Sequence, residues 1–103
     1  MILSSLIALA LAPAQATCVR SPQDGHTGAA RLSWYINDEA VTVDRKKFVK
    51  YGLPRVLEPG DVDLHAPYGN GYFYREKGTH MPDLLYLLID LKDCEFQPYQ
   101  VAQ

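Results

Sequence analysis

Two cysteines, Cys18 and Cys94, are the only ones in this chain, and they stand near its two ends. A disulfide between them would close a loop of about 77 residues, which in the chain-entropy model stabilises a fold by about 4.5 kcal/mol. A single small core contributes only a few kcal/mol of net stability, so such a bridge would be a large part of the total. We therefore expect a small domain whose two ends are tied together.

Residues 1–16, MILSSLIALALAPAQA, carry no charged side chain and have the apolar core and the Ala-Gln-Ala ending of a signal peptide. No basic residue precedes the apolar run, which is too short to span a bilayer. We expect cleavage before Thr17, which leaves a mature chain without a transmembrane segment in the periplasm or in the secreted fraction. Both are oxidising compartments in which a disulfide persists.

The mature chain divides into an extended polar arm at 17–30 and a single domain at 31–103. The arm contains too little apolar surface for a core element. In the domain, short runs of alternating apolar and polar residues are separated by turn residues. We expect an all-β or β-rich α+β fold, namely a small, mostly antiparallel sheet or partly open barrel of about six short strands. The disulfide would tie the arm to the C-terminal strand.

The segment LSWYINDEAVTV predicts a β-hairpin that begins near the start of the domain. Its loop lies at 37–38 or at 38–39, because both choices place the same residues on one face. These inward-facing residues are Leu32, Trp34, Ile36, Val41 and Val43. Trp34 is then a core residue.

Further short strands are expected at 48–51, 62–66 and 72–76. A turn is expected at Glu58-Pro59-Gly60-Asp61, where proline presets φ and glycine is free to take a positive φ.

The apolar run at 84–91 fits a helical stripe as well as a strand face, and its periodicity does not separate the two. In a helix starting at Pro82, Met81 would be the N-cap, and its side chain accepts no hydrogen bond from the free amides. We therefore favour a strand that is buried on both faces.

No nucleophile with a base, carboxylate pair or metal-ligand motif occurs at a spacing known from enzymes. We expect no catalytic residue, no bound metal and no cofactor. The alternative hypothesis is a small hydrolase or metal-dependent enzyme that uses Asp63, His65 and His80, because Asp63 and His65 are two residues apart on one strand.

Two groups of residues are candidates for recognition. The basic patch suits an anion, although such cations can also protect an edge strand from pairing with another sheet. The tyrosine patch suits a ligand or a partner, although its rings can equally cap a small core. The basic patch consists of Arg45, Lys46, Lys47, Lys50 and Arg55, and the tyrosine patch consists of Tyr68, Tyr72, Tyr74 and Arg75.

The net charge of −2 and the expected export argue against nucleic acid as a partner. We expect a non-catalytic binding or accessory protein of the cell envelope or the secreted fraction. Its partner would be an envelope or extracellular protein, or a glycan. A structural role without any small ligand is the third hypothesis.

Overall fold

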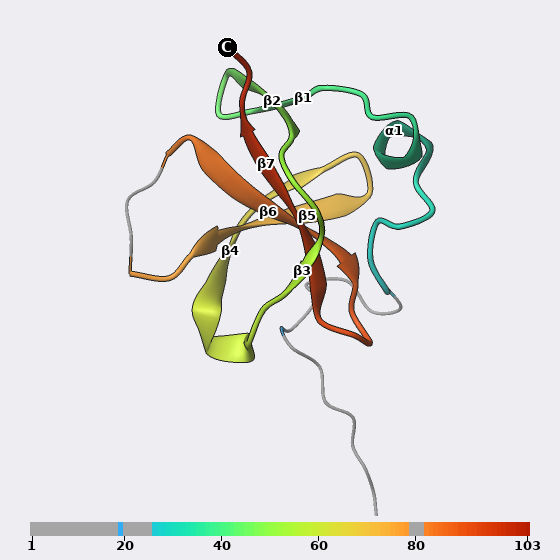
Figure 1. Cartoon of the computed structure of the whole chain (residues 1–103), viewed down its shortest axis with the longest axis vertical. Coiled ribbons are helices and arrows are strands. Elements are labelled where there is room, and N and C mark those ends of the chain that lie inside the picture. Colours follow the sequence, from blue (N-terminus) through green and yellow to red (C-terminus); the bar gives the residue numbers. More distant parts are fainter. Residues whose placement is uncertain (1–18, 20–25, 79–81) are drawn as a thin grey trace, which may run out of the picture.

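The structure is a computed structural model that describes residue 19 and residues 26–78 and 82–103 (Figure 1). Over this part of the chain, seven strands form one antiparallel sheet, accompanied by one turn of α-helix and one 3-10 turn. The prediction of a small all-β fold is confirmed. In chain order the elements are α1 (Ser33–Ile36), β1 (Val41–Val43), β2 (Lys46–Lys50), β3 (Arg55–Val56), η1 (Pro59–Asp61), β4 (Val62–Tyr68), β5 (Gly71–Glu76), β6 (Leu84–Asp90) and β7 (Glu95–Val101).

The sheet curls into a half-barrel. Its strand order is β1-β2-β7-β6-β5-β4, and β3 follows β2 along the same side of β7 (Figure 1). The two edge strands, β1 and β4, come close to each other. In the gap between them, His65 Nε2 of β4 lies 2.5 Å from Oδ2 of Asp44, which follows β1. This contact links the two edges of the sheet.

The larger core cluster lies on the concave face. Both edge strands contribute to it, β1 through Val41 and Val43 and β4 through Ala66 and Tyr68, which is why the cluster lies inside the curl. Trp34 of α1 packs against this cluster. Its buried members are Ala29, Val41, Val43, Phe48, Phe73, Leu85, Leu87, Ile89 and Tyr99.

A second core cluster lies on the opposite face of the sheet. Its buried members are Val62, Tyr74, Tyr86, Leu88 and Phe96. Residues of β6 alternate between the two clusters, so every side chain from Leu85 to Ile89 is buried. The apolar run at 84–91 was expected to form a strand buried on both faces, and this prediction is confirmed.

The predicted hairpin across residues 32–43 is wrong. The segment Ser33–Ile36 forms one helical turn, in which the Ile36 amide donates to the Leu32 carbonyl at 3.0 Å. Trp34 anchors this turn to the sheet, since its Nε1 donates to the Gly69 carbonyl at 2.8 Å. Ile36, expected in the core, is 58 % exposed.

The hairpin that does form joins β1 to β2. Its loop consists of Asp44 and Arg45, both at positive φ (55° and 67°), as a two-residue type I′ turn requires. A second loop of this kind, at Gly69 and Asn70 with φ of 47° and 69°, joins β4 to β5. Strand β4 therefore runs to Tyr68, beyond the expected end at 66.

The turn expected at 58–61 is confirmed and corresponds to η1. The Asp61 amide donates to the Glu58 carbonyl at 2.9 Å, and the Asp61 carboxylate accepts from the Glu58 amide at 2.9 Å. Contrary to the expectation for this turn, Gly60 does not have a positive φ. The following strand β4 contains a bulge between Leu64 and Ala66.

The segment before α1 is hydrogen-bonded to the end of β6. The Ala29 amide donates to Leu88 O at 3.0 Å, and the Leu91 amide donates to Thr27 O at 2.8 Å. Gly28 lies between these bonds with φ of 124°, and a Cβ there would lie 2.2 Å from the Ile89 carbonyl oxygen. Only glycine allows this close approach of the two backbones.

Candidate functional site

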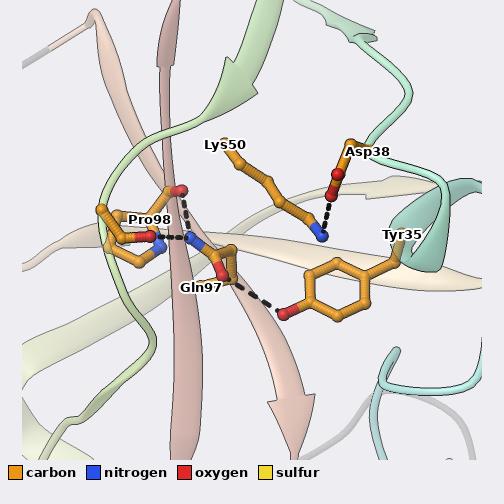
Figure 2. Close-up of polar contacts among 6 residues, drawn as sticks. Tyr35, Asp38, Lys50, Gln97 and Pro98 are labelled. Carbon is orange, nitrogen blue, oxygen red and sulfur yellow. Dashed lines mark hydrogen bonds and ion pairs between the residues drawn. The ribbon is translucent and has the colours of Figure 1, made fainter.

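A buried amide side chain holds a surface loop in place. Gln97 of β7 is 3 % exposed, and among the described residues it is the one polar side chain in the buried class. Its Nε2 donates to the Gly52 carbonyl at 3.0 Å and to the Pro98 carbonyl at 3.1 Å (Figure 2). A buried amide needs such partners, and Gln97 finds one of them in the connection between β2 and β3.

Tyr35 of α1 completes the hydrogen bonding of Gln97. Its hydroxyl donates to Gln97 Oε1 at 3.2 Å. Burial raises the pKa of Tyr35, and the Glu95 and Asp38 carboxylates raise this pKa further. The hydroxyl therefore stays protonated at neutral pH and remains a donor.

The side chain of Lys50 lies over one face of the Tyr35 ring (Figure 2). Its Nζ lies 3.8 Å from the centroid of the Tyr35 ring and 2.5 Å from Oδ1 of Asp38. The ammonium group is thus held by a cation–π contact and an ion pair. This joins α1 to β2 beside the Gln97 network.

The loop held by Gln97 carries three exposed apolar side chains, and we call residues 51–56 the apolar loop. Tyr51 is 53 % exposed, Leu53 83 % and Val56 65 %. The Tyr51 amide donates to the Pro98 carbonyl at 2.9 Å, and Arg55 pairs with Phe96 of β7. The apolar loop is therefore fixed at both ends and, through Gly52, in its middle.

The basic patch does not form one cluster. Lys46 pairs with Asp83 at 3.4 Å, and Lys50 is engaged with Asp38. Lys47 and Arg55 are exposed and have no ion pair within the described part of the chain. Strand β2 lies between β1 and β7, so the expectation that these lysines protect an edge strand is wrong.

Two cations of the basic patch lie near the apolar loop, Lys47 before its start and Arg55 close to its end. Lys47 and Tyr51 lie on the face of β2 opposite the buried Phe48, because strand residues alternate between faces and the Tyr51 amide continues the β2–β7 pairing. Arg55 lies at the other end of the loop, in β3.

The tyrosine patch is divided between the two faces of the sheet. Tyr68 packs on the concave side, with its ring 5.0 Å from that of Trp34. Tyr72 and Tyr74 lie on the opposite face from Phe73, and this face holds the second core cluster.

Within that cluster Tyr74 is 1 % exposed, so its side chain is not accessible to a partner. Tyr72 is half-buried, and its ring contacts that of His26 at 4.8 Å. Arg75 is also half-buried, and its Nε has no hydrogen-bond partner in the region that the structure covers. The structure therefore does not bring these four residues together on one surface.

The residues of the enzyme hypothesis have separate contacts. Asp63 pairs with Lys77 at 3.8 Å, whereas His65 contacts Asp44. His80 lies outside the described residues. No group of three or more His, Cys, Asp or Glu side chains suited to a metal occurs within 26–78 and 82–103.

Cys94 is half-buried in the connection between β6 and β7, at a φ of 56°. It packs against the second core cluster. Its expected partner, Cys18, lies outside the described residues. Val19, the next residue along the chain, packs against the same cluster as Cys94.

The sequence analysis missed the apolar loop and the Gln97 network. One local signal was available for the loop, because Leu53 is an apolar residue placed between Gly52 and Pro54, where neither strand nor helix continues. A second was Gln97 itself, a polar residue among the apolar positions of β7.

Comparison of the chain with protein-family models, curated proteins and solved structures finds no match. In the part of the chain that the structure describes, no helix is both long and apolar enough to cross a membrane.

Proposed function

We propose that this chain is an exported, non-catalytic binding protein that contacts a partner protein through the apolar loop. The observation that carries the proposal is the exposure of Tyr51, Leu53 and Val56 on a backbone fixed by the buried Gln97. Exposed apolar groups on a protein surface are one sign of an interaction site, and these three lie within six residues of one another. A loop held in one conformation also loses little entropy on binding.

The partner surface that fits best is an apolar pocket with an acidic rim. Leu53 would fill the pocket, and Lys47 and Arg55 would face the rim, since neither has an ion pair among the described residues. Charges at a rim act mainly on the association rate and its salt dependence, whereas a buried leucine contributes affinity. The aliphatic character of the loop favours a protein over a glycan.

We also propose export and a Cys18–Cys94 disulfide. The leader at 1–16 supports export, and the position of Val19 supports the bridge. Val19 directly follows Cys18 in the sequence and packs against the same cluster as Cys94. Such a bridge would hold the N-terminal arm against the turn before β7.

The test compares two exposed leucines that lie far apart in the sequence. Leu53 is 83 % exposed in the apolar loop, and Leu64 is 50 % exposed in β4. A partner is isolated from envelope extract of the native host with the wild-type mature domain, purified, and titrated by calorimetry against wild type, Leu53→Asp and Leu64→Asp.

We expect Leu53→Asp to weaken binding by roughly tenfold to a hundredfold, because burying a leucine side chain contributes about 1.5 to 3 kcal/mol. Leu64→Asp introduces the same charge elsewhere and should leave the Kd unchanged. Equal Kd values for the two variants would overturn the proposal. Lys47→Glu with Arg55→Glu should slow association and reduce its dependence on salt.

A further inference from the structure

Arg55 of the apolar loop also lines a cleft of about 380 Å³ that hollows the surface. This volume is within the range of small-molecule sites. The cleft is lined by charged and apolar side chains, among them those of Arg55, Leu57, Asp61, Val62, Glu76 and Tyr86.

The strand order places opposite charges on opposite walls. Arg55 is on β3 and Glu76 is on β5, with β7 and β6 between them. Three strand spacings separate β3 from β5 by about 14 Å across the sheet. Tyr86 of β6 lies between them and forms part of the lining.

The charges of Arg55 and Glu76 both affect the pKa of Tyr86. The Cζ of Arg55 lies 5.9 Å from the centroid of the Tyr86 ring. Burial raises the pKa of Tyr86, the Arg55 guanidinium lowers this pKa, and the Glu76 carboxylate raises it. The two charges are therefore within electrostatic reach of the same hydroxyl group.

Arg55 is the cation that is available to a ligand. It has no ion pair within the described ranges, whereas Lys77, which also lines the cleft, pairs with Asp63 at 3.8 Å. A guanidinium group offers a planar pair of N–H donors that matches a carboxylate. On the opposite wall, the carboxylates of Asp61 and Glu76 suit an ammonium group.

We propose that this cleft binds a small zwitterion, namely a free α-amino acid or a dipeptide. The ligand carboxylate lies on Arg55, its ammonium group faces Asp61 and Glu76, and its apolar part lies on Leu57 and Val62. A simple anion would be repelled by the two carboxylates. A sugar would lack a stacking platform, because Tyr86 is only 4 % exposed.

The experiment is a titration of the isotope-labelled mature domain, observed through its backbone amide signals in NMR spectra. The probes are the common L-amino acids and the dipeptide Ala-Leu, added to millimolar concentration. N-acetyl-L-leucine, which lacks the ammonium group, and L-leucinamide, which lacks the carboxylate, are the matched comparison ligands. Comparing the free amino acids with the dipeptide shows which of these two kinds of zwitterion the cleft binds.

We expect saturable shifts at 55–62 and 74–77 with at least one zwitterion, and binding at least tenfold weaker for each comparison ligand. Arg55→Gln should weaken binding of the zwitterion at least tenfold. Arg31→Gln removes another exposed arginine, away from the cleft, and should leave binding unchanged. Absence of shifts with every zwitterion, or equal binding of the comparison ligands, would overturn the proposal.

Arg55 belongs both to the apolar loop and to this cleft, and Leu53 is the residue that separates the two proposals. Leu53 is the most exposed apolar side chain of the loop but does not line the cleft. The variant Leu53→Asp should therefore bind the zwitterion as the wild type does. A failure of zwitterion binding would leave the effect of Leu53→Asp on the partner protein unaffected.

Discussion

Replacing Gly28 by alanine tests how the segment before α1 is held against the sheet. A Cβ at this position would lie 2.2 Å from the Ile89 carbonyl oxygen and 2.4 Å from the Ile89 carbonyl carbon. Favourable contacts between such atoms need about 3.5 Å, so the two backbones must separate by about 1 Å. The φ of 124° is also a conformation that alanine rarely adopts.

The cost follows from these two effects. Backbone strain at such a φ contributes about 1 to 3 kcal/mol. Separation also breaks up to three hydrogen bonds between this segment and β6, with lengths of 3.0, 3.1 and 2.8 Å. Each contributes about 1 kcal/mol net, so Gly28→Ala should lower the free energy of unfolding by about 3 to 5 kcal/mol.

Two other glycines are matched controls. Gly78 has a φ of 78° and no atom within 4 Å of a Cβ, so Gly78→Ala isolates the backbone strain and should cost about 1 to 2 kcal/mol. Gly60 has neither a positive φ nor a close neighbour, so Gly60→Ala should be neutral or slightly stabilising.

The assay is urea unfolding followed by the fluorescence of Trp34, the single tryptophan, whose ring lies against that of Phe73. A loss for Gly28→Ala no larger than that for Gly78→Ala would refute the reasoning. It would show that the segment does not approach β6 as closely as the structure has it.

Three further predictions concern stability. Burial raises the pKa of Tyr99 and of Tyr86, so the unfolded chain releases these protons first. The stability that these two tyrosines contribute should be fully present below about pH 10 and be lost as the pH rises above it, and a urea midpoint that does not fall above pH 10 would contradict this. Cys94→Ser and Cys18→Ser should each cost roughly 2 to 5 kcal/mol, as should reductant, whereas two free thiols by Ellman titration with an unchanged melting temperature would exclude the bridge. Gln97→Leu should cost about 1 to 3 kcal/mol and speed hydrogen exchange of the apolar loop, and unchanged exchange would contradict the role of this side chain.

Sequence patterns predicted strands correctly where the pattern of neighbouring residues and the packing against distant residues favour the same structure. The run at 84–91 became a strand because both of its faces meet a core cluster, which also explains why its periodicity was ambiguous. The turn at 58–61 is closed by hydrogen bonds between Glu58 and Asp61, and a local pattern could predict it for that reason.

The predictions failed where distant residues decide the structure. Alternation over Leu32, Trp34 and Ile36 is too short to separate a strand from one helical turn, and the Gly69 carbonyl that binds Trp34 is 35 residues away. Gln97 likewise finds its partners 45 and 62 residues earlier in the chain. The burial of the face that holds Tyr74 depends on packing that no local pattern contains.

The central claim is that the apolar loop is a docking surface for a partner protein, and site-specific photo-crosslinking tests it most directly. p-Benzoylphenylalanine is introduced in the native host at position 53, and separately at position 64 as the matched exposed site. The account predicts one adduct of defined mass at position 53, absent at position 64 and weakened by Lys47→Glu with Arg55→Glu. No adduct at position 53, or the same adduct at both positions, would contradict it.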